Sequence, residues 1–207
     1  MIVIVHYGLG NPASIKNMIS KIGGEAVVSS DPAVIAGAQK LILPGVGAFD
    51  TGMKNIHDAG LLDVLNEKAL KEKVPVLGIC LGMQLLTKSS TEGNLPGLGW
   101  VDADCVRFHF PESGKESGGL RVPHMGWNEV NIKNSAALFR NFSSPPSFYF
   151  VHSYHPRGVR EEEVLATTHY GYEFVSAFQR GNIAGVQFHP EKSHAFGMQL
   201  LKNFLEG

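Results

Sequence analysis

The sequence predicts an α/β fold, in which a mostly parallel central sheet is flanked by helices and extended by antiparallel strands in the C-terminal half. Short apolar runs of strand length alternate with patterns of helical periodicity through the first hundred residues, as in sheets built from β-α-β units. After Trp100, short β-rich runs separated by turns replace this alternation and indicate antiparallel hairpins. The chain contains no repeat and no linker, so we expect one domain over residues 1–207.

The N-terminal half contains four candidate strands with helices between them. The run 2–5 is fully apolar, which is typical of a central parallel strand covered on both faces. Asn11-Pro12 and Asp31-Pro32 each place a capping side chain before a proline, so a helix is expected to begin at each. Gly23-Gly24 should end the first helix, and the leucines of 61–69 mark another. The further candidate strands are 26–28, 41–43, which Pro44 should end, and 74–79.

The C-terminal half contains the antiparallel strands and a closing helix. Phe196, Leu200, Leu201 and Phe204 recur at helical spacing and predict an amphipathic helix. The polar, glycine-rich segment 111–119 is expected to be a mobile loop. The β-rich runs are 101–110, 120–122, 129–132, 148–151, 164–168, 174–178 and 183–188.

The charge and composition exclude several classes of function. Lys and Arg number 18 against 19 Asp and Glu, so no polybasic surface for nucleic acid or anionic membrane is expected. No apolar run reaches the ~18 residues of a membrane span, and the start of the chain lacks the features of a signal peptide. Two cysteines form no disulfide framework. We therefore expect a cytoplasmic protein that binds neither nucleic acid nor membrane.

Gly78-Ile79-Cys80-Leu81-Gly82 is the strongest candidate for a catalytic motif. It follows a buried apolar run and precedes a helical pattern, as in the G-x-S-x-G nucleophile elbow, with cysteine in place of serine. The glycines allow backbone to approach a strained turn, and a helix N-terminus directs N–H groups toward an oxyanion. A buried cysteine with only a packing role is the structural alternative.

His189 is the candidate base for this nucleophile. It follows the apolar run 183–188, and functional groups of an open parallel sheet gather at the carboxyl ends of the strands, where Cys80 also lies. Glu191, beyond Pro190, could orient the imidazole and complete a Cys–His–acid relay. Because the chain has nine histidines, an ordinary loop histidine is the alternative.

Two other patterns leave different chemistry open. Gly8-Leu9-Gly10-Asn11-Pro12-Ala13 matches the G-x-G-x-x-A dinucleotide-binding pattern, although the chain hardly has room for the catalytic domain that normally accompanies it. His152 with His155, or His189 with His194, could ligate a metal, but neither pair has the spacing of a zinc motif. We therefore expect no cofactor and no metal.

The elbow and the His189-Pro190-Glu191 motif together resemble the triad-type, class I glutamine amidotransferases. Further blocks, spread over nearly the whole chain, resemble one branch of that family, the glutaminase subunits of imidazole glycerol phosphate synthase in histidine biosynthesis. The proline-glycine loop and the tryptophan block are the parts specific to that branch. The blocks are Tyr7-Gly8-x-Gly10-Asn11, Pro44-Gly45-Val46-Gly47-Ala48-Phe49, Pro123-His124-Met125-Gly126-Trp127-Asn128, Phe150-Val151-His152-Ser153-Tyr154 and Gln187-Phe188-His189-Pro190-Glu191-Lys192-Ser193.

The resemblance implies a role for each site residue. Cys80 would attack the side-chain amide of glutamine and form a γ-glutamyl thioester, His189 would move protons, and Glu191 would orient His189. The oxyanion hole would be formed by Val46, Gly47 and Leu81. Glutamine would be held by Gly82, Gln84, Glu92, His152, Ser153 and Tyr154.

The resemblance also implies a partner. Ammonia would pass to a separate barrel-shaped cyclase subunit, which would form a heterodimer with this chain and make imidazole glycerol phosphate and aminoimidazole carboxamide ribotide. Candidate contacts are Asn11, Met125 and Trp127. At 11–13 the chain has Asn-Pro-Ala where the family more often has Asn-Leu-Arg, so any partner contact made by that arginine is missing. An amidotransferase or cysteine-triad hydrolase serving a different acceptor is the alternative.

Overall fold

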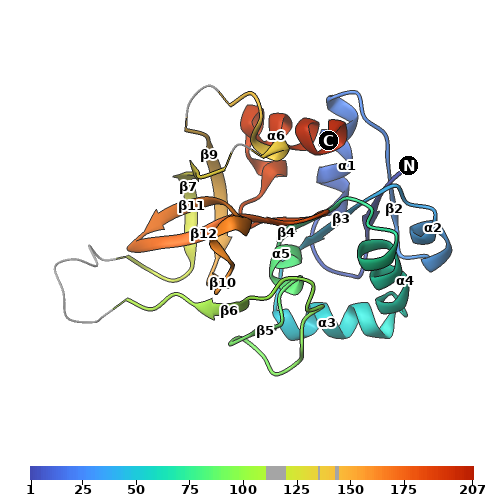
Figure 1. The fold of residues 1–207 in the computed structure, drawn as a ribbon, viewed down its shortest axis with the longest axis horizontal. Helices are drawn as coiled ribbons and strands as arrows, with labels where there is room; N and C mark the ends of the chain where they lie inside the picture. Colours follow the sequence, from blue (N-terminus) through green and yellow to red (C-terminus); the bar gives the residue numbers. More distant parts are fainter. Residues whose placement is uncertain (111–119, 135, 143–144) are drawn as a thin grey trace.

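The central sheet runs through the whole molecule (Figure 1). A computed structural model describes residues 1–110, 120–134, 136–142 and 145–207. The first five strands of the sheet are parallel, and the last three pair antiparallel, which confirms the predicted fold class. Within the described residues the strand order is β2 (Ala26–Ser29), β1 (Ile2–Val5), β3 (Lys40–Gly45), β4 (Val76–Cys80), β13 (Ile183–Val186), β12 (Tyr172–Arg180), β11 (Val164–Tyr170) and β8 (Asn131–Ile132).

Two smaller sheets come from the chain between Ser89 and Arg157. In one, β7 (His124–Glu129) pairs antiparallel with β9 (Ser147–His152). In the other, β6 (Asp104–Arg107) lies between β10 (Tyr154–Arg157) and β5 (Ser89–Ser90). Only Ser153 separates β9 from β10, so this residue stands at the junction of the two small sheets.

Helices cover both faces of the central sheet (Figure 1). On one face lie α1 (Pro12–Lys21) and α6 (His194–Glu206), which contact each other. On the other face lie α2 (Pro32–Ala36), α3 (Phe49–Asp58), α4 (Leu62–Asn66) and α5 (Leu81–Leu85). The shorter helical turns are Glu67–Lys71, Ala137–Phe139, Glu161–Glu163 and Pro190–Lys192. No helix of the described residues is long and apolar enough to cross a membrane.

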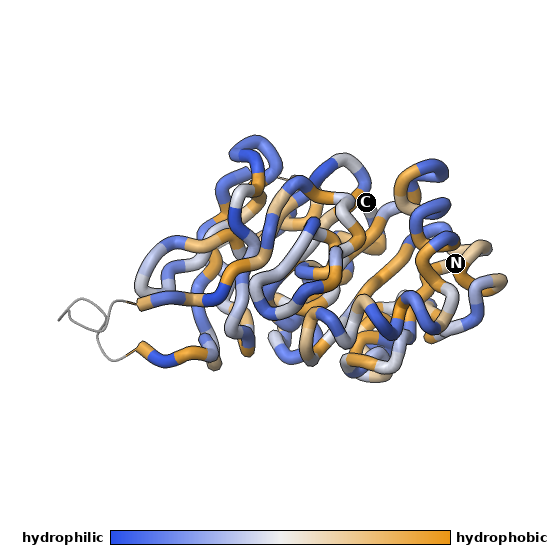
Figure 2. Tube along the Cα trace, turned by 90° about the horizontal axis from the view of Figure 1, so that it is seen from below, coloured by the Kyte–Doolittle hydropathy of each residue, from blue (hydrophilic) through white to orange (hydrophobic). Residues whose placement is uncertain are grey.

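The core consists of two apolar clusters, one on each face of the sheet. Val3 and Val5 face the cluster under α3, whereas Ile4 between them faces the cluster under α1 and α6. Side chains alternate between faces along a strand, so a strand covered by helices on both sides must be apolar at every position. Figure 2 shows orange, hydrophobic segments within the molecule and blue, hydrophilic segments on many of its outer turns. The apolar run 2–5 is therefore the central strand that the sequence predicted.

The two predicted helix starts are confirmed. The Asn11 side chain accepts a hydrogen bond from the Ser14 backbone N–H (3.2 Å) at the start of α1. The Asp31 side chain accepts from Ala33 N–H (2.8 Å) at the start of α2. In each helix a proline occupies the first turn, where its missing N–H leaves no hydrogen bond unmade.

The sequence analysis did not predict helix α3 (Phe49–Asp58). Its N-cap residue, Ala48, has no side chain that can cap, and the Phe49 N–H donates instead to the Glu92 carboxylate (2.9 Å). This acceptor lies in a distant loop, so no local capping signal precedes the helix. The helix predicted over 61–69 is present as α4 followed by the wider turn Glu67–Lys71.

The structure corrects several of the predicted strands and leaves one loop untested. Strand β3 does not end at Pro44 but continues to Gly45, because a parallel strand neighbour pairs with it there. Residues 120–122 are not a strand, since Pro123 follows and lacks a backbone donor. The run 129–132 is split between β7 and β8, and strand β10 was not predicted. The loop expected at 111–119 lies outside the described residues.

Candidate active site

Cys80 lies at the junction of β4 and α5, with a backbone conformation that residues other than glycine rarely adopt. Its backbone has φ +54° and ψ −110°, and α5 begins at the next residue. The elbow closes because its flanking residues lack a Cβ. A Cβ on Gly78 would lie 2.8 Å from the Gly82 carbonyl oxygen, and one on Gly82 would lie 1.7 Å from the Leu43 oxygen. Strain of this kind is concentrated at functional sites.

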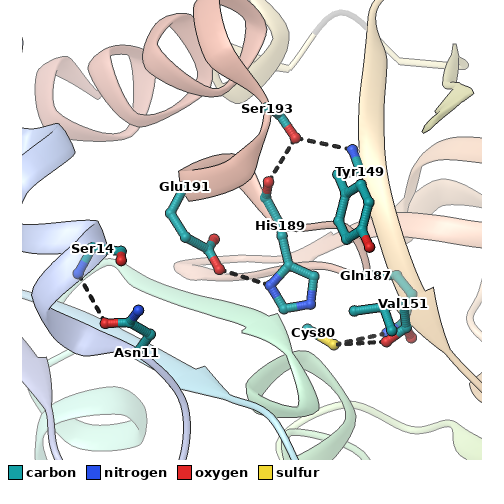
Figure 3. A network of polar contacts seen from close by, with 9 residues as sticks. All are labelled: Asn11, Ser14, Cys80, Tyr149, Val151, Gln187, His189, Glu191 and Ser193. Atoms are coloured by element: carbon teal, nitrogen blue, oxygen red, sulfur yellow. Dashed lines mark hydrogen bonds and ion pairs between the residues drawn. The ribbon is translucent and has the colours of Figure 1, made fainter. Parts of the chain in front are cut away.

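His189 is held beside Cys80 by the strand order and by β9. It follows β13, which pairs directly with β4. The His189 N–H donates to the Tyr149 carbonyl (2.9 Å), and the Ser193 hydroxyl donates to the His189 carbonyl (2.6 Å). That same hydroxyl accepts from the Tyr149 N–H (3.0 Å). The turn is thereby fixed on both sides, and the imidazole lies between Glu191 and Cys80 (Figure 3).

The electrostatics of the site favour a charged His189. Its Nδ1 lies 2.7 Å from Glu191 Oε1, and both side chains are buried. Burial by itself lowers the pKa of His189, but the negative charges at Cys80 and Glu191 outweigh it and raise the pKa to about 10. His189 Nε2 has no hydrogen-bond partner within the described parts of the chain. An imidazolium with a free N–H beside a sulfur atom can deliver and recover a proton.

Two further groups contact the Cys80 sulfur. The Val151 carbonyl oxygen lies 3.9 Å from Sγ, and the Gln187 amide Nε2 lies 3.8 Å from it (Figure 3). Gln187 is fully buried, and the sequence analysis assigned it no role. The signal was available, because Gln187 is a polar residue at the end of an otherwise apolar run that leads directly to His189.

A pocket of about 240 Å³ opens beside the sulfur. It is formed by the end of β4, the loop after β3 and the β9–β10 junction. Its lining residues include most of the predicted site, together with Pro123 and Val151, which were not predicted. The predicted residues that line it are Val46, Gly47, Cys80, Leu81, Gln84, Glu92, His152, Ser153 and Tyr154. Gly82 is not among them, because it packs against Leu43 instead.

Comparison with known proteins identifies the family. Residues 3–207 match the family described as "Glutamine amidotransferase class-I". The chain belongs to this family. It is similar to the imidazole glycerol phosphate synthase subunits HisH 2 of Methanococcus maripaludis (52% identity, 100% of this chain, 99% of that protein) and HisH 2 of Pseudomonas aeruginosa (47%, 100% and 99%). The HisH subunit of Bdellovibrio bacteriovorus is 48% identical, with both chains covered completely.

Solved structures of amidotransferases share the fold. A crystal structure of a glutamine amidotransferase has a TM-score of 0.75 at 22% identity and covers 100% of this chain and 98% of that chain. PurLQS of Thermotoga maritima has a TM-score of 0.74 at 16% identity, with 99% and 97% covered. The arrangement of sheet and helices around the site is therefore that of the class I amidotransferases.

The loop after β3 forms one wall of the amidotransferase pocket. Gly45 pairs with Cys80 in the sheet, and a Cβ there would lie 2.3 Å from the Tyr7 hydroxyl. Val46 is half exposed, and Gly47 has φ +135°, a conformation that favours glycine. Val46 and Gly47 of this loop line the pocket together with Cys80.

The predicted partner-contact residues lie outside the amidotransferase pocket. Met125 and Trp127 are exposed on one face of β7, and the Trp127 ring stacks on His194 (5.4 Å between centroids, 4° between planes). Met125 pairs across the ribbon with Val151, which lines the pocket. Asn11 is exposed, and its side chain caps α1.

The histidines considered as metal ligands have other partners. His152 Nδ1 donates to the Tyr154 carbonyl (2.8 Å), whereas His155 Nε2 lies 2.9 Å from the Tyr172 hydroxyl. His194 stacks on Trp127. Among residues 1–110, 120–134, 136–142 and 145–207, no three His, Cys, Asp or Glu side chains are grouped so that they could hold a metal ion.

Proposed function

We propose that this chain is the glutaminase subunit of imidazole glycerol phosphate synthase, which hydrolyses glutamine and passes the ammonia to a cyclase subunit. The observation that carries the proposal is the strained Cys80 elbow, which lines a pocket and lies beside a buried His189–Glu191 pair (Figure 3). The full-length relatives named HisH support the choice of synthase. Histidine biosynthesis in the cytoplasm is the corresponding setting.

In the first half of the proposed reaction, Cys80 Sγ attacks the carboxamide carbon of glutamine. The carbonyl oxygen becomes an oxyanion, which accepts hydrogen bonds from the Leu81 N–H at the start of α5 and from N–H groups of Val46 and Gly47. His189 Nε2 gives its proton to the departing nitrogen, so ammonia leaves and a γ-glutamyl thioester remains.

In the second half, water replaces ammonia. The now neutral His189 takes a proton from the water as it attacks the thioester carbon, and the carbon–sulfur bond breaks to release glutamate and restore the thiolate. Glu191 keeps Nδ1 protonated throughout, which leaves Nε2 facing the reacting atoms. We propose that the substrate is held by the predicted residues that line the pocket, Gln84, Glu92, His152, Ser153 and Tyr154, and not by Gly82, which packs against Leu43.

We propose that the cyclase subunit docks over β7 as the second half of a heterodimer. The proposed contacts are Met125 and Trp127, which are exposed on β7, and Asn11, which is exposed at the start of α1. Tryptophan anchors are over-represented among the residues that dominate binding energy. Because Met125 pairs with pocket residue Val151, docking there adjoins the site where ammonia forms.

The experiment that tests the function compares the two cysteines. Cys80→Ser should abolish glutamine-dependent synthesis by the reconstituted enzyme while added ammonium still supports it. Cys105→Ser is the matched control, because Cys105 is fully buried and burial raises the pKa of its thiol to about 12. Normal glutamine turnover by Cys80→Ser would contradict the proposal. Glutamine hydrolysis that does not respond to the cyclase subunit would indicate a different acceptor.

A further inference from the structure

A chain of hydrogen bonds runs from β7 to the pocket. It begins at Asn128, whose Nδ2 lies 2.9 Å from the His169 carbonyl oxygen and 3.2 Å from His124 Nε2. His124 Nδ1 lies 3.1 Å from His152 Nε2, directly across the β7–β9 ribbon. His152 Nδ1 lies 2.8 Å from the Tyr154 carbonyl oxygen. Both histidines are buried, and the proposed chemistry uses neither His124 nor Asn128.

The donor at each step of this chain is fixed by its neighbours. The Tyr154 carbonyl only accepts, so His152 carries its proton on Nδ1. Burial lowers the pKa of His152 well below its ordinary value, so the ring is neutral and its Nε2 accepts from His124 Nδ1. Burial also lowers the pKa of His124 to about 4, so His124 Nε2 accepts from the Asn128 amide. The Asn128 oxygen accepts from the Glu129 N–H (2.8 Å), which fixes the amide orientation.

The chain continues from the Tyr154 carbonyl to the sulfur atom. This carbonyl also accepts from Gln84 Nε2 (2.9 Å), and the second hydrogen of that amide points to Gln187 Oε1 (3.1 Å). Gln187 Nε2 in turn lies 3.8 Å from Cys80 Sγ. Three pocket residues, His152, Tyr154 and Gln84, are thus joined at one oxygen atom.

We propose that His124 and Asn128 are positioning residues for the glutamine pocket. The hydrogen bonds to and from His124 hold the His152 ring so that its Nδ1–H reaches the Tyr154 carbonyl, the same oxygen that accepts from the Gln84 amide. Neither residue lines the pocket, but both stand on β7, the strand that exposes Trp127. The inference rests on the proposed function, since the pocket is taken to bind glutamine.

A matched pair of variants tests this role. His124→Phe removes the donor to His152 but keeps a ring that can stack on Phe150 (4.7 Å) and Tyr170 (4.0 Å). Tyr172→Phe removes the hydroxyl from another buried histidine, His155, which does not line the pocket. His124→Phe therefore loses the bonds to His152 and from Asn128, Tyr172→Phe loses the bond to His155, and both variants have an aromatic ring at the altered position.

The first readout is inactivation of the isolated chain by a glutamine-like diazoketone that alkylates Cys80. His124→Phe should lower kinact/KI about tenfold, the size expected when one buried hydrogen bond is lost, mainly through KI. Tyr172→Phe should match the unmodified chain. Asn128→Leu, at the far end of the chain of bonds, should change KI in the same direction and replaces His124→Phe if that variant does not fold. An unchanged KI in both variants would overturn the role.

The second readout is ¹⁵N NMR of the histidine-labelled chain, which a merely structural role would not affect. His124 and His152 should both carry their proton on Nδ1, and in His124→Phe the ¹⁵N shift of His152 Nε2 should change because this nitrogen loses its donor, whereas Tyr172→Phe should leave that shift unchanged. A proton on Nε2 of either ring in the unmodified chain would overturn the inference. If the unmodified chain does not react with the diazoketone even with the cyclase subunit bound, the proposed function fails, and the tautomers are still decided by NMR.

Discussion

The space around Cys80 limits which residues can stand at neighbouring positions. The elbow requires glycine at 78 and 82 because backbone oxygen atoms occupy the positions that a Cβ would take. The same residues also bring β3 against the start of α5, which places the loop after β3 beside the sulfur. A small change at these glycines therefore acts on the fold and on the site together.

Gly82→Ala should destabilise the protein by about 3 kcal/mol, at the upper end of the usual cost of overpacking, since the added Cβ would lie 1.7 Å from the Leu43 oxygen. Gly37→Ala is the control, because Gly37 has φ −81° and its new Cβ would meet nothing closer than 3.5 Å. It should stabilise by about 0.4–1 kcal/mol. Urea unfolding of both variants measures this, and equal effects would contradict the prediction.

Glu191→Gln should lower the pKa of His189, because the variant loses a buried negative charge 2.7 Å from Nδ1. In the unmodified protein the pKa of His189, about 10, lies above the unfolded value of ~6.5. Its contribution to stability is therefore full below pH ~6.5 and is lost as the pH rises toward 10. NMR titration of His189 measures the shift. Glutamine turnover should fall less than in His189→Ala, and an unchanged titration would exclude the ion pair.

Helix α3 and the loop before β6 are joined by hydrogen bonds in both directions. Glu92 accepts from the Phe49 N–H at the start of α3, and Asp50 of that helix accepts from the backbone N–H groups of Asn94 (2.9 Å) and Leu95 (3.0 Å). Only Ala48 separates Gly47 from the start of α3. Glu92, which lines the pocket, therefore also fixes the end of the proposed oxyanion loop.

Glu92→Ala should cost about 1 kcal/mol of stability through the lost cap and should also lower glutaminase activity. Asp31→Ala removes the cap of α2, far along the sheet from β4, and should cost a similar amount of stability with no change in activity. Thermal unfolding and initial rates of both variants test this. A Glu92→Ala variant that is destabilised but fully active would show that Glu92 caps α3 without contributing to glutamine turnover.

We expect the loop after β3 to respond to the partner, because Val46 and Gly47 of this loop line the pocket. Gly47→Pro should reduce activation by the cyclase subunit, because proline fixes φ near −65° and Gly47 has φ +135°. Losing one oxyanion donor costs about 10²–10³ in kcat, so the expected loss is of this order. Glutaminase rates with and without the cyclase subunit measure the activation, and a binding titration measures the Kd. A loss explained entirely by weaker binding would reject the loop as the responding element.

At the scale of the whole molecule, the sheet and the β7–β9 ribbon place the chemistry next to an exposed apolar surface. Trp127 and Met125 lie on the ribbon, and their neighbour Val151 lines the pocket. A partner bound to this surface can change the pocket only if it favours one of two arrangements of the site. The isolated chain should therefore hydrolyse glutamine slowly and the complex faster by orders of magnitude.

Trp127→Ala should weaken binding of the cyclase subunit by about 2 kcal/mol or more, as expected for an interface anchor. Leu70→Ala is the matched control, because Leu70 is 47% exposed and Trp127 is 49% exposed, but Leu70 lies beyond α4. Isothermal titration of both variants provides the comparison. Equal affinities would place the docking surface elsewhere.

Much of the fold could be predicted because it depends on interactions between residues close together in the sequence. The caps Asn11 and Asp31, the apolar run 2–5 and the glycines around Cys80 act on neighbours a few residues away, so their effects appear in the sequence. The sequence by itself therefore determined the fold class, the nucleophile elbow and the pairing of His189 with Glu191, which are two positions apart.

Long-range contacts decided the rest. Helix α3 is capped by Glu92 from 43 positions away, β3 extends to Gly45 because β4 pairs with it, and Gln187 approaches Cys80 only when β13 lies beside β4. The hydrogen-bond chain through His124 and His152 also exists only across the β7–β9 register. Such contacts join segments with no fixed spacing along the chain, so only the tertiary structure could reveal them.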